Sequence, residues 1–146
     1  MAETSSRKDP FGAFRFELRI DDLAVAGFST CTGLQLDTEV LDYNEGGLNT
    51  HVLKFPGRTK QVNLVLRRGI IDRDLWDWYF DLTQGIVKFR NLSVVVHDAT
   101  GLKDEIVWQC TRAFPTKWVG PELNAMQSTL VVETLELCHE GLSRKK

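Results

Sequence analysis

The stretch FRFELRID, residues 14–21, alternates apolar and charged side chains without a break. Its apolar residues, Phe14, Phe16, Leu18 and Ile20, share one face, while the charged residues share the other. Successive side chains of a strand point to opposite faces, so the pattern predicts a strand with one buried face. After a turn at Asp21 and Asp22, residues 23–28 are expected to return as the second strand of a hairpin.

Similar patterns continue along the chain. Alternation predicts strands over residues 34–41 and 61–66, and short apolar runs predict a meander over residues 86–90, 92–97 and 105–111, with a last strand over residues 130–138. The total is roughly eight or nine short strands.

One helix is predicted over residues 72–84, because Leu75, Trp78, Tyr79 and Leu82 fall on a single helical face. Asp72 can cap its start, and Gly85 can end it. The sequence therefore predicts a mainly β protein, a single domain over residues 1–146 built as an antiparallel β-sandwich or barrel with one packed helix.

Composition narrows the functional classes. A formal net charge of -2 disfavours general nucleic-acid binding, which needs a concentrated basic face. The three cysteines, Cys31, Cys110 and Cys138, lie far apart and predict neither a zinc site nor a disulfide framework, as suits a reducing cytoplasm. No apolar run is long enough for stable membrane insertion, and no ordinary secretion signal is expected. Residues 1–10 and the basic residues 143–146 are expected to be flexible tails.

The sequence offers no catalytic motif. His51, His97 and His139 are isolated, and no acidic or cysteine neighbour stands at metal-ligand spacing. Phosphate-binding glycine loops and nucleophile elbows are absent from the sequence. Asp72, Asp74 and Asp77 are explained by the dipole at a helix start. We therefore expect no enzyme activity, no cofactor and no metal.

Residues 43–60 form a long excursion that predicts a projecting arm. Turn-forming residues stand at both ends, and the arm includes a candidate contact set of Tyr43, Asn44, Glu45, Gly46, Gly47, Leu48, Asn49, Pro56, Gly57 and Arg58. Its mixed composition suits a segment that becomes ordered on contact with a partner. A surface loop without a partner is the alternative.

The tryptophans indicate a second candidate surface. Trp78 lies on the inner helix face and is expected in the core, whereas Trp76 points away from it. Trp118, between Pro115 and Pro121, is expected in an irregular segment. A partly apolar surface of this kind fits a neighbouring protein better than a nucleic acid.

Short motifs in a fixed order complete the pattern. They are Asp9-Pro10-Phe11, Phe14-Arg15-Phe16, Gly27-Phe28-Ser29, Gly33-Leu34, Glu45-Gly46-Gly47, Pro56-Gly57-Arg58, Leu75-Trp76-Asp77-Trp78, Pro115-Thr116-Lys117-Trp118, Gly120-Pro121, Leu123-Asn124-Ala125 and His139-Glu140-Gly141. In this order the chain resembles the tail tube proteins of contractile phages, and within them the tube subunits of extracellular contractile injection systems such as the Photorhabdus virulence cassettes and the antifeeding prophage.

The resemblance implies hexameric rings that stack into a hollow tube inside a contractile sheath, with the arm joining successive rings. It also implies contacts with the sheath, baseplate, tube-initiator, terminal cap and tape-measure proteins, and effector cargo in the lumen. Trp76, Trp118 and Asn124 are then candidates for subunit or sheath contacts. Assembly would take place in the bacterial cytoplasm, in a particle that can be released from the cell.

Two other functions stay open at this point. The chain could be the tube-initiating paralogue or a related secretion-tube ring protein, because such copies share one fold. A barrel that holds a small ligand or flavin would need convergent polar groups and a phosphate site. Lumen-lining residues, strand register and the role of the cysteines are not fixed by the sequence.

Overall fold

The computed structural model describes residues 16–21, 23–25, 28–47, 50–68, 73–97, 104–127 and 131–146. Several sequence predictions lie outside these ranges: the flexible tail over residues 1–10, the strand residue Phe14, the turn at Asp22, the cap Asp72 and the arm residues Leu48 and Asn49.

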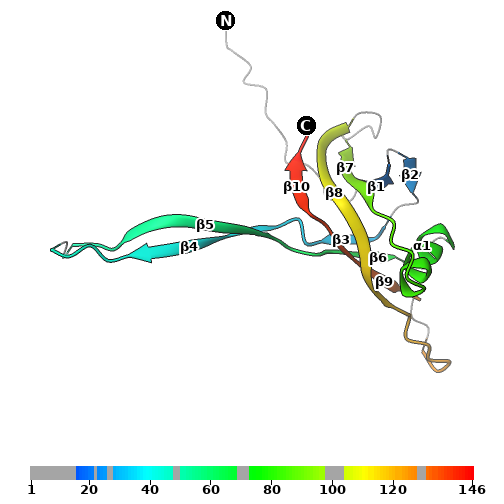
Figure 1. Cartoon of the computed structure of the whole chain (residues 1–146). Coiled ribbons are helices and arrows are strands. Elements are labelled where there is room, and N and C mark those ends of the chain that lie inside the picture. The colour runs from blue at the N-terminus through cyan, green and yellow to red at the C-terminus, as the bar shows by residue number, and fades with distance from the viewer. Residues whose placement is uncertain are drawn as a thin grey trace, which may run out of the picture.

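The described residues form ten strands and one helix, which confirms the mainly β prediction (Figure 1). They are β1 (Phe16–Ile20), β2 (Leu23–Val25), β3 (Thr30–Thr32), β4 (Leu36–Tyr43), β5 (Leu53–Gln61), β6 (Leu64–Arg68), α1 (Arg73–Thr83), β7 (Arg90–His97), β8 (Asp104–Val119), β9 (Glu133–Cys138) and β10 (Gly141–Arg144).

The strands form one large antiparallel sheet and a separate two-stranded ribbon. The large sheet has the order β2-β1-β7-β8-β9-β6-β3, with β10 also paired to β8, and the ribbon is β4-β5. The 16-residue strand β8 joins the two halves of the sheet, because its first part pairs with β7 and β10 and its last part with β9. The β8–β9 register shifts between Pro115 and Lys117. Proline cannot donate to a ladder, so an irregularity at this point is expected.

The core lies between the two halves of the sheet. It is built from inward-facing residues of the strands, two residues of the helix and Phe28, which precedes β3: Leu18, Ile20, Phe28, Leu64, Leu66, Leu75, Trp78, Leu92, Val94, Cys110, Ala113, Leu135 and Leu137. The period of two explains which residues of each strand face inward.

Replacing Leu64 by alanine is expected to lower the free energy of unfolding by about 2–5 kcal/mol, because Leu64 is fully buried and its removal leaves a cavity. Leu36→Ala is the matched control, since Leu36 is 48% exposed in the ribbon, and it should change that free energy by under about 0.5 kcal/mol. Urea unfolding of both variants measures the difference. Equal losses in the two would contradict this placement of the core.

Helix α1 follows the prediction closely. Leu75 and Trp78 are buried, and the Trp78 indole Nε1 donates a 2.8 Å hydrogen bond to the carbonyl of Lys88. Gly85 follows the helix with a φ of 86°, a left-handed conformation that glycine adopts without strain.

The strand predicted over residues 34–41 is confirmed as β4, although all residues of β4 are exposed in the ribbon. Other predictions were wrong. Residues 86–89 are not a strand, and β8 runs well past residue 111. Residues 143–146 are not a flexible tail, because Ser143 and Arg144 belong to β10, and the amide of Lys145 donates a 2.8 Å hydrogen bond to the carbonyl of Val107. Residues 108–111 of β8 pair with β10 and so supply backbone hydrogen-bond partners for this end of the chain.

Candidate assembly surfaces

The most prominent surface is the ribbon of β4 and β5, which extends far from the body (Figure 1). Pairing runs from Leu36 with Gln61 at its root to Tyr43 with Leu53 near its tip. Neither strand pairs with any other described strand. Two-stranded ribbons are marginally stable alone in water, so this ribbon is a candidate for contacts with a partner.

The predicted arm residues lie in two places. Tyr43 ends β4, Asn44 and Glu45 follow it, and Gly46 and Gly47 form the turn at the tip, where Gly47 has a φ of 94°. The prediction that Pro56, Gly57 and Arg58 form a second turn was wrong.

These three residues lie inside β5, where the register shifts opposite Glu39. A Cβ atom on Gly57 would lie 3.2 Å from the Cβ of Glu39, so glycine permits the close approach of the two strands. The residues typical of a turn therefore make a bulge in a longer strand.

Large apolar side chains remain exposed on the ribbon. They are Leu36, Val40, Leu41, Tyr43, Val52 and Phe55, each more than 40% exposed. Tyr43 and Phe55 make an edge-to-face contact with ring centroids 6.5 Å apart. By register, Leu41, Tyr43 and Phe55 share one face of the ribbon, and exposed apolar surface of this kind is a candidate for protein interaction. Leu36, Val40 and Leu41 were not among the predicted contact residues, although two strand patterns flanking Gly46-Gly47 are a hairpin signal.

The second candidate surface is centred on the helix. Trp76 and Trp118 contact each other edge to face with centroids 4.7 Å apart, and Trp76 also stacks on Phe80. Trp118 lies in β8, so the expected irregular segment was wrong. Both indoles are partly buried against the core, whereas Phe80 is 49% exposed. Trp76 thus contacts both Phe80 and Trp118.

Beyond β8, residues 120–127 form an exposed loop that contains Asn124. The side-chain oxygen of Asn124 accepts a 3.0 Å hydrogen bond from the amide of Met126, and its carbonyl accepts one from Gln127. This local turn leaves Leu123 79% and Met126 93% exposed. Sequence analysis singled out Asn124 and missed these two apolar residues, because one-sided periodicity is absent from a loop.

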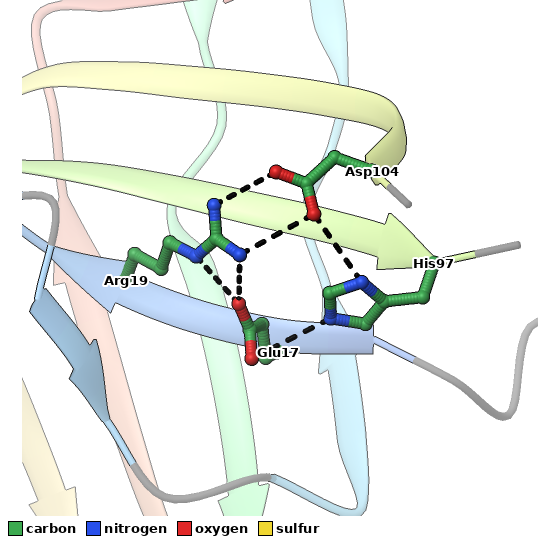
Figure 2. A network of polar contacts seen from close by, with 4 residues as sticks. All are labelled: Glu17, Arg19, His97 and Asp104. Carbon is green, nitrogen blue, oxygen red and sulfur yellow. Dashed lines mark hydrogen bonds and ion pairs between the residues drawn. The ribbon is translucent and has the colours of Figure 1, made fainter. Parts of the chain in front are cut away.

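A polar network joins the strands β1, β7 and β8 (Figure 2). Arg19 of β1 donates hydrogen bonds to Glu17 and, at 2.9 and 3.3 Å, to both carboxylate oxygens of Asp104 in β8. The His97 ring of β7 lies between the carboxylates, 3.3 Å from Asp104 and 3.4 Å from Glu17. Sequence analysis treated His97 as isolated because these partners are distant along the chain. The network ties β1, β7 and β8 together.

Asp104→Asn is expected to weaken the network at neutral pH. The hydrogen bond from Arg19 is the main cause that lowers the pKa of the Asp104 carboxyl. A lowered native pKa contributes stability above the unfolded value of about 3.9, and that contribution disappears as the pH falls through the native value. Because Asp104 is 32% exposed, the loss should be only about 0.2–1 kcal/mol at pH 7 and should vanish in acid.

Urea unfolding of both proteins between pH 7 and pH 2 measures this difference. Asp42→Asn in the ribbon is the control, since its ion pair with Lys54 is 4.0 Å long and both side chains are mostly exposed. A loss for Asp104→Asn that persists unchanged at the lowest pH would contradict the assignment.

Two of the cysteines, Cys31 and Cys110, are unsuited to nucleophilic chemistry. All three are free thiols, and burial raises the pKa of Cys31 to about 12 and that of Cys110 to about 11. A thiol with such a pKa holds little nucleophilic thiolate at neutral pH. Within the described ranges, no group of three or more metal-ligating side chains comes together, and no helix is long and apolar enough to span a bilayer.

One small cavity opens at the Cys31 end of the core. It has a volume of about 210 Å³ and an apolar lining of Phe16, Cys31, Leu34, Val94, Val96 and Trp108. Sites for small molecules usually measure about 300–1,000 Å³ and include a few convergent polar groups. Its size and lining do not match the ligand or flavin site considered from the sequence.

The chain is similar in fold to components of contractile injection systems. A search of curated proteins found no sequence match. A solved structure of the sheath-tube complex of an extracellular contractile injection system, PVC, contains a chain of similar fold, with a TM-score of 0.85, 22% identity and 99% of each chain covered. The tube-terminating cap of the anti-feeding prophage gives a TM-score of 0.87 at 21% identity, covering 100% of this chain and 99% of that one.

A chain of the anti-feeding prophage baseplate is also similar, with a TM-score of 0.82, 22% identity and coverage of 93% and 95%. At these identities the likeness concerns the fold. The family is shown by the sequence itself, because residues 12–143 match the model of the T4-like virus tail tube protein gp19. The chain belongs to the T4-like virus tail tube protein family, a family of structural proteins.

Proposed function

We propose that the chain is the structural subunit of the inner tube of a contractile, phage-tail-like injection system. Hexameric rings of the subunit stack into a hollow tube, and contraction of the surrounding sheath drives the tube through a target membrane. The observation that carries the proposal is the β4-β5 ribbon, which has no partner strand in the described fold and exposes large apolar side chains. Membership of the tail tube family supplies the context.

Such a tube needs two kinds of contact. A ring closes when one surface of a subunit fits a different surface of its neighbour, whereas stacking continues without closure. Unpaired sheet edges suit the contact within a ring, because another chain can complete their backbone hydrogen bonds. The ribbon suits the contact between rings, since an eight-residue strand reaches roughly 26 Å at about 3.3 Å per residue.

The helix-side surface serves the remaining contacts. Phe80 with Trp76 and Trp118, and the loop with Leu123, Asn124 and Met126, offer apolar surface on a different part of the molecule from the ribbon. We assign this surface to a neighbouring subunit or the sheath protein. The further partners are the baseplate, tube-initiator, terminal cap and tape-measure proteins, with effector cargo in the lumen.

The proposed role is not enzymatic, and the particle would be assembled in the bacterial cytoplasm before release. A tube-initiating paralogue is a second candidate. It is favoured by the likeness to the cap and baseplate chains, whose TM-scores of 0.87 and 0.82 lie on either side of the 0.85 for the sheath-tube chain. Main tube subunits and terminal ring proteins would differ in copy number in the particle.

Native mass spectrometry of the purified chain over a range of concentrations tests the proposal. We expect monomer at low concentration and a discrete six-subunit ring, followed by stacks, as the concentration rises. The last subunit to join a ring of six makes two contacts at once, so closed rings are favoured over partial ones and the transition should be steep. A monomer at every concentration, or a small oligomer that carries a bound cofactor, would contradict the tube subunit.

A further inference from the structure

The two strands of the ribbon carry opposite charges. Strand β4 contains Asp37, Glu39 and Asp42 and no lysine or arginine, whereas β5 contains Lys54, Arg58 and Lys60 and no carboxylate. The register pairs Asp37 with Lys60 and Asp42 with Lys54. Within the ribbon, Lys60 forms a 2.9 Å ion pair with Glu39. One long edge of the ribbon is therefore acidic, and the other is basic.

These charges remain available to a second partner. The side chains of Lys54 and Lys60 are each 69% exposed, and those of Asp42 and Glu39 are 63% and 46% exposed. The outer backbone edges of β4 and β5 have no strand partner in the described fold. A carboxylate can accept several hydrogen bonds, so one cation of its own chain does not saturate it.

On the basis of the proposed tube function, we infer that ribbons of neighbouring copies lie edge to edge, with the acidic strand β4 of one copy against the basic strand β5 of the next. Each carboxylate strand then lies between two cationic strands. When neighbouring ribbons point the same way, β4 of one copy runs opposite to β5 of the next, so the pairing is antiparallel as it is within each ribbon.

The charge pattern also excludes the competing arrangement. Two-fold pairing would place β4 against β4 or β5 against β5, and like charges directly opposite each other destabilise a sheet. The segregation therefore rejects a closed dimer and selects a head-to-tail contact between the ribbons of ring neighbours, which adds to the sheet-edge contacts within the ring while the ribbon tips reach the next ring. The occupant of each ribbon edge is a second copy of this chain, and the charges set its direction.

A charge-swapped variant tests the inference. It combines Asp37→Lys, Glu39→Lys and Asp42→Lys with Lys54→Glu, Arg58→Glu and Lys60→Glu, so that ion pairs within each ribbon are kept with reversed sign. Two matched variants reverse only β4 or only β5. Unfolding of each monomer in urea checks the body, whose core residues are unchanged.

Assembly is measured by sedimentation and electron microscopy, alone and in mixtures of differently labelled proteins. The swapped variant should assemble alone within about threefold of the wild-type critical concentration. Each variant with one reversed strand should need at least about tenfold more protein alone and should recover when the two are mixed. The swapped variant and the wild type should form separate rings, because every mixed edge joins like charges.

Random mixing of swapped and wild-type chains in one ring would overturn the inference while leaving the tube function intact. Normal assembly of the variants with one reversed strand, or failure of a stably folded swapped variant to assemble, would overturn it as well. A wild-type chain that forms no ring would overturn both the tube function and this inference.

Discussion

Deleting residues 45–55 is expected to abolish tubes longer than a single ring. The deletion removes the turn at Gly46 and Gly47 and the first residues of β5, including the exposed Phe55. Fixing the backbone of a residue costs about 1–2 kcal/mol, and in the proposed tube contacts with the next ring offset this cost at the tip of the ribbon. We therefore expect rings of the truncated chain not to stack.

Electron microscopy of the particle with its sheath present measures the length of the tubes. The isolated subunit should unfold at the same urea concentration as the wild type, because the ribbon pairs with no other described strand. Long tubes of the truncated chain inside the sheath would show that the ribbon does not join rings. A large loss of subunit stability would show that it belongs to the body.

Replacing Gly33 by alanine adds one methyl group. We expect this addition to lower the free energy of unfolding more than the same addition at any other glycine that the structure describes. Gly33 lies between β3 and β4, at the root of the ribbon, and has a φ of 97°. A Cβ atom there would lie 2.0 Å from the carbonyl oxygen of Asn63 and 3.0 Å from the Cα of Leu64. Both neighbours are backbone atoms of a segment that leads into the buried strand β6, so neither can move aside cheaply.

Strain and the clash together should cost at least about 3 kcal/mol, which places the variant among severely destabilised ones. Gly46→Ala is the control, because a Cβ atom there would meet nothing within 4 Å. Urea unfolding of the two variants separates the effects. A change of under about 0.5 kcal/mol for Gly33→Ala would contradict the close crossing at the root of the ribbon.

Local patterns made the body of the fold predictable. Alternation identified β1, where Leu18 and Ile20 are buried, and a helical period of 3.6 identified α1 with Trp78 in the core. Both are elements with one face against the protein interior, so their apolar residues recur in the sequence at the period of a strand or a helix. Strand β10 was missed because its four residues carry no such period.

The ribbon was only half predicted, for a physical reason. Residues 34–41 alternate like a half-buried strand, yet Val40 and Leu41 are exposed in the subunit. Alternation shows that a strand has two different faces, and it cannot tell whether the chain itself or another copy covers the apolar one. Likewise, Pro56 and Gly57 have the chemistry of a turn and of a bulge alike, and only the partner strand decides between them.

Contacts between distant residues lay beyond the sequence pattern. Asp104 lies 85 residues from Arg19, so their hydrogen bonds depend on the order of β1, β7 and β8 in the sheet. The same holds for Trp118, which meets Trp76 only because β8 continues beyond Pro115 to pack beside the helix. Strand order is set by the whole core, and no short segment encodes it.

The most direct test is cryo-electron microscopy of the native particle that contains this chain, in its extended state. The proposal predicts a hollow cylinder of six-subunit rings inside the sheath, built along its whole length from this chain, with the β4-β5 ribbon of each copy in contact with copies of the same chain. A cylinder made of another protein, with this chain absent or confined to one end, would contradict its role as the main tube subunit.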